Sequence, residues 1–168
     1  YFCGGMRIDS TQDLINDLKA GVYKNIAITT HHKPDGDAMG STLGLMHFLN
    51  KIVNNATVIT PTDYADFLSW LPGNDTVINF EADQTIGEQI IANADLVFCL
   101  DFNRLSRINK LGEIIRNKNV KTVMIDHHLD PENFSDFTFW DKTSSSTCEL
   151  VFEWIENYFG SEFVDQDM

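Results

Sequence analysis

The sequence predicts an α/β fold in which helices flank a doubly wound, mainly parallel β-sheet. Short apolar or β-branched runs alternate along the chain with longer segments whose apolar residues recur every three or four positions, as strands alternate with helices. The runs 96–100 and 122–125 are almost continuously apolar, which suits strands buried on both faces of a parallel sheet. These observations together indicate the doubly wound class.

Composition limits the class of protein. The chain has 168 residues, 43% of them hydrophobic, so one domain with a full core is expected. Twelve basic residues against 25 acidic ones give a net charge of −13, which argues against long duplex nucleic acid held in a basic groove. The sequence has no apolar run of about eighteen residues and no basic-then-apolar amino terminus, so we expect no membrane span, no secretory signal and a cytoplasmic location.

The amino terminus and the cysteines contribute little to the fold prediction. Residues 1–5 have no pattern and precede Met6, so we interpret them as a cloning remnant and the domain as residues 6–168. Cys3, Cys99 and Cys148 are odd in number and lack CxxC spacing, so neither a disulfide nor a zinc knuckle is expected.

The first half of the sheet and its helices precede residue 80. The predicted elements are a helix from Ser10 to Gly21, a strand at 26–30, a helix from Met39 to Val53 and a strand at 57–60. Residues 67–73 then form a brief amphipathic turn that ends in a strong break signal. Trp70 in this turn suits either a stacked base or the core, and we favour the core because Leu68 and Leu71 lie beside it.

The second half continues the alternation. The predicted elements are a helix around 86–91, a strand at 96–100, a mostly helical segment at 103–119, strands at 122–125 and 137–140, and a helix that ends at Gly160. The last helix begins with the capping-box pattern Ser146–Glu149, so the cluster Ser144–Thr147 is explained most simply as that cap.

Chemistry is expected above all at residues 30–41, between the first strand and its helix. Asp35 and Asp37 flank one glycine in a segment that Pro34 should hold extended, so their carboxylates point to one side about 6–7 Å apart. His31 adds an imidazole, and mixed imidazole and carboxylate ligands suit Mn, Fe or Zn better than Ca. Taken alone, the same residues also fit a solvated Asp-Gly turn.

Two further strands end in residues of the metal-ligand type. The run 96–100 leads into Asp101, and the run 122–125 leads into Asp126, His127 and His128. Parallel sheets bind ligands beyond the carboxyl ends of their strands, so these side chains should meet those of the first motif at one edge. Surface polarity alone does not explain this convergence.

These three motifs resemble those of the DHH (RecJ-like) phosphoesterases. The first resembles His31-x-x-Pro34-Asp35-x-Asp37-Ala38-x-Gly40-Ser41, the second is an aspartate that closes an apolar strand, and the third is Asp-His-His at 126–128. All three occur in order over most of the chain. The Asp-Ala-x-Gly-Ser pattern at 37–41 and residues 67–73 look most like those of the nanoRNase/pAp-phosphatase branch of the family.

The resemblance implies a centre with two divalent cations, most simply Mn²⁺. The implied metal ligands are His31, Asp35, Asp37, Asp101 and His127, and Asp101 would be a catalytic bridge between the two ions. His128 would be catalytic too, as a phosphate contact or as the acid near the leaving oxygen. Asp126 would orient a histidine. Because neighbours that leave a strand point in opposite directions, we expect only one of His127 and His128 to face a given ion.

Contacts to the substrate phosphate are assigned to His128, Ser41 and Arg107. Gly40 and Ser41 open the predicted helix, whose free amides and dipole favour an anion. Arg104 and Arg107 lie in the first turns after Asp101, and either is suited to a bidentate phosphate contact or to a solvated surface position.

The implied function is hydrolysis of short oligoribonucleotides or of 3′,5′-bisphosphonucleosides (pAp), so a small phosphorylated nucleotide is the expected partner. Two alternatives remain: a manganese-dependent inorganic pyrophosphatase, and a nucleotide-sensing domain of the same fold without turnover. The presence of all five ligands favours an enzyme. Residue patterns do not determine the oligomeric state.

The family also implies parts that these 168 residues lack. A fourth motif, an aspartate after the last helix, and a carboxy-terminal substrate-binding domain are expected in the family, whereas here only Asp165 and Asp167 follow that helix. A frayed terminus is a poor ligand. We therefore expect the chain to be part of a longer protein, with one tight and one weak metal site.

Overall fold

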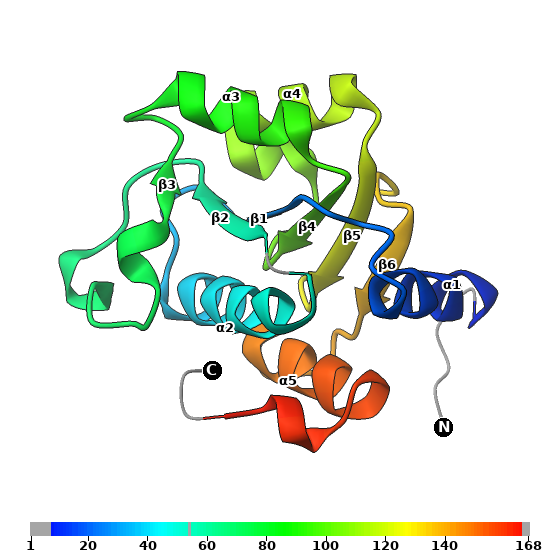
Figure 1. Ribbon diagram of the computed structural model, residues 1–168. Coiled ribbons are helices and arrows are strands. Elements are labelled where there is room, and N and C mark those ends of the chain that lie inside the picture. The colour runs from blue at the N-terminus through cyan, green and yellow to red at the C-terminus, as the bar shows by residue number, and fades with distance from the viewer. Residues whose placement is uncertain (1–7, 54, 166–168) are drawn as a thin grey trace.

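A six-stranded parallel sheet forms the centre of the computed structural model, which describes residues 8–53 and 55–165 (Figure 1). The strands are β1 (Ile26–Thr29), β2 (Ala56–Thr60), β3 (Ile78–Asn79), β4 (Leu96–Leu100), β5 (Lys121–Asp126) and β6 (Phe137–Trp140). They lie in the order β3-β2-β1-β4-β5-β6, and every neighbouring pair is parallel. The predicted α/β class is confirmed.

Helices cover both faces of the sheet. They are α1 (Ile8–Lys19), α2 (Gly36–Ile52), α3 (Gln84–Asn93), α4 (Asn109–Lys118) and α5 (Thr147–Tyr158). Helices α3 and α4 lie on one face, and α1, α2 and α5 lie on the other (Figure 1). Each face has its own apolar cluster: Phe48 and Phe98 belong to the one under α2 and α5, and Phe102 and Ile115 to the one under α3 and α4.

The order of the strands reverses between β1 and β4. From β1 the chain moves outward to β2 and β3, and it then returns to place β4 on the other side of β1. Connections that leave in opposite directions open a crevice at the carboxyl ends of the two central strands, where ligands of doubly wound proteins bind. His31 and Asp101 follow these two strands.

Helix boundaries differ from the predictions at two places that matter. Helix α1 begins at Ile8, before Ser10, so Ser10 is not its cap. Helix α2 begins at Gly36, and Asp35 is its N-cap, with a carboxylate that accepts the Ala38 amide at 3.0 Å. The expected extended segment through Asp37 is therefore wrong, because a capping aspartate makes the glycine and the second aspartate a good first turn.

The turn after β2 also differs from the prediction. Residues Asp66–Leu68 form a 3₁₀ helix in which Leu68 is buried, whereas Phe67 is 74% and Trp70 75% exposed. Leu68 is thus the side chain of this turn that enters the core, and both aromatic rings lie outward. The expectation of a core Trp70 is wrong.

The remaining predictions concern caps, thiols and membrane spans. The Ser146 hydroxyl accepts the Glu149 amide at 3.1 Å, which confirms the cap of α5. Cys99 is a buried free thiol and Cys148 a partly buried one, while residues 1–5, with Cys3, lie outside the described residues. Within the described chain, no helix has both the length and the apolar character that crossing a membrane requires.

Candidate metal centre

Asp101 lies at the middle of the candidate site. It directly follows β4, its amide donates to the Ile125 carbonyl at 3.1 Å, and the residue is only 2% exposed. Its φ of +63° is in the left-handed region, which is unusual for a residue other than glycine and occurs often at functional sites. The backbone at the end of β4 thus holds one carboxylate inside the crevice.

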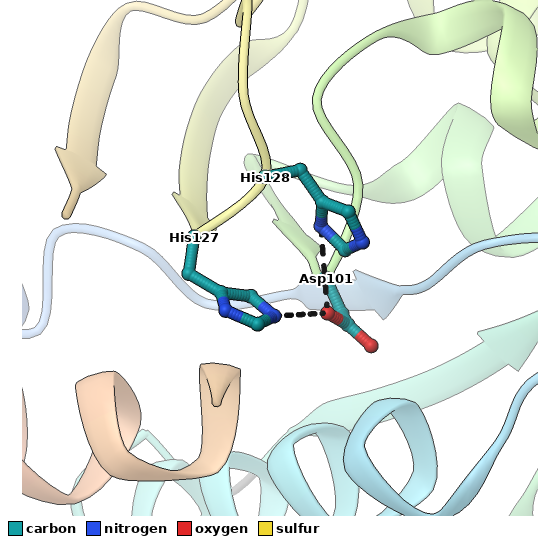
Figure 2. A group of neighbouring side chains, drawn as sticks. All are labelled: Asp101, His127 and His128. Carbon is teal, nitrogen blue, oxygen red and sulfur yellow. Dashed lines mark ion pairs between the residues drawn. The ribbon is translucent and has the colours of Figure 1, made fainter. Parts of the chain in front are cut away.

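Each oxygen of Asp101 faces a different histidine. Oδ2 is 3.5 Å from Nε2 of His31, and Oδ1 is 3.6 Å from Nε2 of His127. Figure 2 shows His127 and His128 reaching toward this carboxylate from the end of β5. One carboxylate between two imidazoles is the arrangement that a ligand shared by two cations requires.

Backbone carbonyls orient both histidines. Nδ1 of His31 is 2.9 Å from the His32 carbonyl, and Nδ1 of His127 is 3.3 Å from the Ser144 carbonyl. A ring that donates its Nδ1 proton to a carbonyl keeps its Nε2 lone pair free, which is how metal-binding histidines are usually held. Both Nε2 atoms lie toward carboxylates.

Asp35 and Asp37 complete two groups of donors that share Asp101. Oδ1 of Asp35 is 3.9 Å from His31 Nε2, and Oδ2 of Asp37 is 3.7 Å from His127 Nε2. The first group is His31, Asp35 and Asp101, whose donor atoms lie within 4.8 Å of one another. Asp37, Asp101 and His127 do not form such a compact group, but Nε2 of His127 lies 3.7 Å from Asp37 and 3.6 Å from Asp101 and so connects them. The structure thus brings all five predicted ligands together.

His128 lies on the same side of the site as His127. Their ring centroids are 4.9 Å apart, and His128 Nδ1 is 3.8 Å from Asp101 Oδ1. The expectation that the two rings point in opposite directions is wrong, because β5 ends at Asp126 and the strand alternation stops there. A donor group of Asp101, His127 and His128 also lies within 4.8 Å, and Nδ1 of His128 is bonded to Asp126 at 2.7 Å, which leaves Nε2 free.

Asp126 is fully buried and only half satisfied. Its Oδ1 accepts from His128, whereas its Oδ2 has no hydrogen-bond partner among the described residues. This contact agrees with the expected role of orienting a histidine. A buried carboxylate oxygen without a partner is costly, and it therefore indicates a function for the surrounding group.

The electrostatics of the site favour a bound cation. No lysine or arginine of the described residues forms an ion pair with Asp35, Asp37, Asp101 or Asp126. Hydrogen bonding to Asp101 raises the pKa of His31 above its usual value, although burial opposes the shift. Carboxylates and imidazoles of this kind, without a lysine or arginine beside them, are a donor set that suits divalent metals.

Cys148 borders the site without suiting a cation. Burial and the nearby Asp37 carboxylate raise the pKa of its thiol, so the thiol stays protonated at neutral pH. A thiolate is the form that binds metals.

Thr147 was missed as a site residue by sequence reasoning. It is fully buried, and its hydroxyl donates to Asp101 Oδ1 at 3.0 Å. Five consecutive hydroxyl residues at 143–147 were the available signal, because a cap needs only one of them.

Of the residues predicted to contact the substrate phosphate, Ser41 lies inside helix α2 and away from solvent. Ser41 is 1% exposed and donates to the Ala38 carbonyl at 3.2 Å, so it does not reach the site. The premise that Gly40 and Ser41 open the helix is wrong, because α2 begins one turn earlier.

The two arginines lie near the site. Arg107 is exposed, and its carbonyl accepts the His32 amide at 3.0 Å, which places its backbone beside the end of β1. Arg104 donates to the Asp130 carbonyl at 3.2 Å.

The chain is similar in sequence to two curated proteins and in structure to a solved one. A probable bifunctional oligoribonuclease and PAP phosphatase NrnA from Streptococcus mutans is 29% identical over 133 residues, which are 79% of this chain and 39% of that protein. The bifunctional oligoribonuclease and PAP phosphatase NrnA of Mycoplasma genitalium is 28% identical over 150 residues, 88% of this chain and 44% of that protein. An exopolyphosphatase-related protein from Bacteroides fragilis has a crystal structure with a TM-score of 0.90 and 34% identity, matched over 99% of this chain and 48% of that one.

The chain spans less than half the length of the curated relatives it matches. Residues 25–168 match the DHH family, N-terminal domain. That range contains the three motifs whose side chains meet at the carboxyl ends of β1, β4 and β5. The chain therefore belongs to the DHH family.

Proposed function

We propose that this protein is a phosphoesterase that uses two divalent cations to hydrolyse short oligoribonucleotides or 3′,5′-bisphosphonucleosides. The observation that carries the proposal is the position of Asp101, with one oxygen toward His31 at 3.5 Å and the other toward His127 at 3.6 Å. The geometry supports a shared ligand and hence a pair of ions rather than one.

In this proposal His31, Asp35 and Asp101 hold one ion, and Asp37, Asp101 and His127 hold the other. Mixed imidazole and carboxylate ligands suit Mn²⁺, which is the expected metal. When bound, two such ions would supply the positive charge that stabilises a phosphoryl group during attack by water. The protein itself fixes the donors, through the carbonyl contacts of both histidines and the buried backbone of Asp101.

His128 is assigned to the substrate phosphate or to the leaving oxygen. Its Nδ1 is held by Asp126 at 2.7 Å, which fixes the ring and leaves Nε2 for a contact outside the metal ligands. Arg107 is assigned to a substrate phosphate, because no ion pair engages its guanidinium among the described residues and its backbone lies beside β1. An arginine there would partly offset the acidity of the chain.

The substrate class rests on the names of the relatives. Proteins named as oligoribonucleases and PAP phosphatases match this chain, so a small phosphorylated nucleotide is proposed as the partner. The net charge of −13 is consistent with a short substrate held by metals rather than by a basic groove. The cytoplasmic location remains a prediction.

One assay tests the proposal. The protein is stripped with chelator, reloaded with Mn²⁺ and incubated separately with a diribonucleotide, with pAp and with pyrophosphate, and the products are identified. We expect mononucleotides from the first or AMP from the second, and none of these products from an Asp101→Asn control. Hydrolysis of pyrophosphate alone would favour the pyrophosphatase alternative, and tight nucleotide binding without products would favour a sensing domain.

A further inference from the structure

Thr147, the first residue of α5, contacts two of the proposed ligands at once. Its hydroxyl donates to Asp101 Oδ1 at 3.0 Å, and its amide donates to Asp37 Oδ2 at 2.8 Å. The next amide, that of Cys148, donates to Asp37 Oδ1 at 2.8 Å. The start of α5 therefore joins a carboxylate that follows β4 to a carboxylate of the first turn of α2.

The hydroxyl of Thr147 is not needed to begin the helix. Ser146 is the N-cap, and its side chain accepts the Glu149 amide at 3.1 Å. The Glu149 carboxylate in turn accepts the Ser145 amide at 2.8 Å. Since the cap is complete without Thr147, its hydroxyl is free to serve the site.

Among the polar side chains around Asp101, Thr147 is the nearest. The hydroxyl is 3.0 Å from Oδ1, whereas His31 and His127 are 3.5 and 3.6 Å from the two oxygens. A hydrogen bond at this distance fixes the rotation of the carboxylate, and each oxygen has further lone pairs for a cation. The rotation decides whether the two oxygens face two different histidines.

We propose that Thr147 is a positioning residue whose hydroxyl orients the Asp101 carboxylate to bind the pair of cations, while the backbone amides of α5 hold Asp37. The proposal rests on the proposed function, because it assumes that these carboxylates are metal ligands. The Thr147 hydroxyl makes no contact with the metals or the substrate; it acts through Asp101. The effect should resemble that of other residues that hold metal ligands in place, about 10–100-fold in metal affinity.

The test measures Mn²⁺ binding to chelator-stripped protein by calorimetry. Thr147→Val removes the hydroxyl while it keeps the side-chain shape and the amide, and Thr147→Ser restores the hydroxyl. Thr42→Val is the matched control, because Thr42 is also fully buried but its hydroxyl donates to the carbonyls of Ala38 and Met39 within α2. Thermal melting of the metal-free proteins checks that each variant folds.

We expect a dissociation constant for Mn²⁺ that rises about 10-fold or more in Thr147→Val and stays within a few-fold of wild type in Thr147→Ser and Thr42→Val. Wild-type affinity in Thr147→Val would overturn the positioning role and leave the metal site standing. If Thr147→Val does not fold, Thr147→Ser decides, since a large loss of affinity with the hydroxyl present would contradict the inference. Wild-type protein that binds no Mn²⁺ would overturn the proposed function itself.

Discussion

Aspartates lie at both ends of the parallel strands, and their surroundings differ. We call the side where the strands begin the amino edge of the sheet and the side where they end the carboxyl edge. At the amino edge, Asp95 accepts the amides of Lys24 and Asn25 at 2.8 and 3.0 Å. Asp136, before β6, pairs with the Lys121 ammonium at 2.7 Å. At the carboxyl edge, Asp101 and its neighbouring carboxylates have no lysine or arginine partner among the described residues.

The comparison shows that partners, not residue type, decide what an aspartate does. Asp136 is balanced by a lysine and Asp95 accepts two backbone amides, so both join neighbouring segments and stabilise the fold. The carboxyl-edge carboxylates also accept hydrogen bonds, but they crowd together without a lysine or arginine partner, so we expect them to attract a cation. Substitutions at the two edges should therefore change different measurements.

The largest expected effect is at the carboxyl edge. Asp101→Asn should lower Mn²⁺ affinity by roughly 100-fold or more, since losing a residue that only holds a metal ligand in place already costs about 10–100-fold. Asparagine accepts the left-handed backbone of this position, and the change removes a charge from a crowded group. The melting temperature of the metal-free variant should therefore equal or exceed that of wild type.

Asp35→Ala and Asp37→Ala are the controls for this prediction. Each contributes to one ion, so each should retain more metal than Asp101→Ala after reloading. Equal metal contents in all three variants would count against a shared Asp101.

The second prediction separates two neighbouring histidines of the same edge. His127→Ala should lose one of the two ions, because its Nε2 faces both Asp37 and Asp101. His128→Ala should keep both ions and hydrolyse roughly 100-fold more slowly, because its Nδ1 is bonded to Asp126 and its role lies with the substrate. Metal analysis together with a turnover assay distinguishes the two variants. If His128→Ala proved to be the metal-deficient variant, His128 would be the metal ligand and His127 the substrate contact.

The third prediction concerns the amino edge and is smaller. Asp136→Asn should lower the free energy of unfolding by about 1–2 kcal/mol, because it weakens bonds to the Lys121 ammonium and to the Thr122 amide at 2.7 and 2.9 Å. Mn²⁺ affinity should not change. Urea unfolding and a metal titration of the same variant measure both, and a change in metal affinity without a change in stability would break the comparison.

The same residue predicts a dependence on pH. Burial alone would raise the pKa of Asp136, but the bonds to Lys121 and Thr122 outweigh burial and lower it below 3.8. A lowered pKa in the folded state means that the stabilisation is present above the unfolded value and is lost as the pH falls through the folded one. The stability difference between wild type and Asp136→Asn should therefore disappear in strong acid.

Sequence alone predicted the convergence of the ligands, because the carboxyl ends of all strands in a parallel sheet lie on the same side. Apolar runs that end in Asp101 and in 126–128 must deliver those residues to a shared edge if the sheet is parallel. The start of α2 was harder to predict, because Asp-Gly-Asp fits a turn as well as a capped first turn, and the misplaced start removes the argument that assigned Ser41 to the phosphate.

Features that depend on distant contacts could not be predicted. Trp70 is exposed because Leu68 occupies the inner side of its turn, and nothing local to the sequence decides between them. Thr147 meets Asp101 across 46 positions of sequence and Asp37 across 110. Such pairs follow from how α5 packs against α2, which a pattern of three or four residues does not encode.

Electron paramagnetic resonance of the Mn²⁺-loaded protein tests the central claim most directly. Two ions that share Asp101 should lie about 3.5–4 Å apart and interact magnetically. We predict the spectrum of a coupled pair once enough Mn²⁺ is present to fill both sites, and its loss in Asp101→Asn but not in Asp136→Asn. A spectrum of isolated, uncoupled ions at every Mn²⁺ concentration in the wild-type protein would contradict a shared aspartate and the two-metal site built on it.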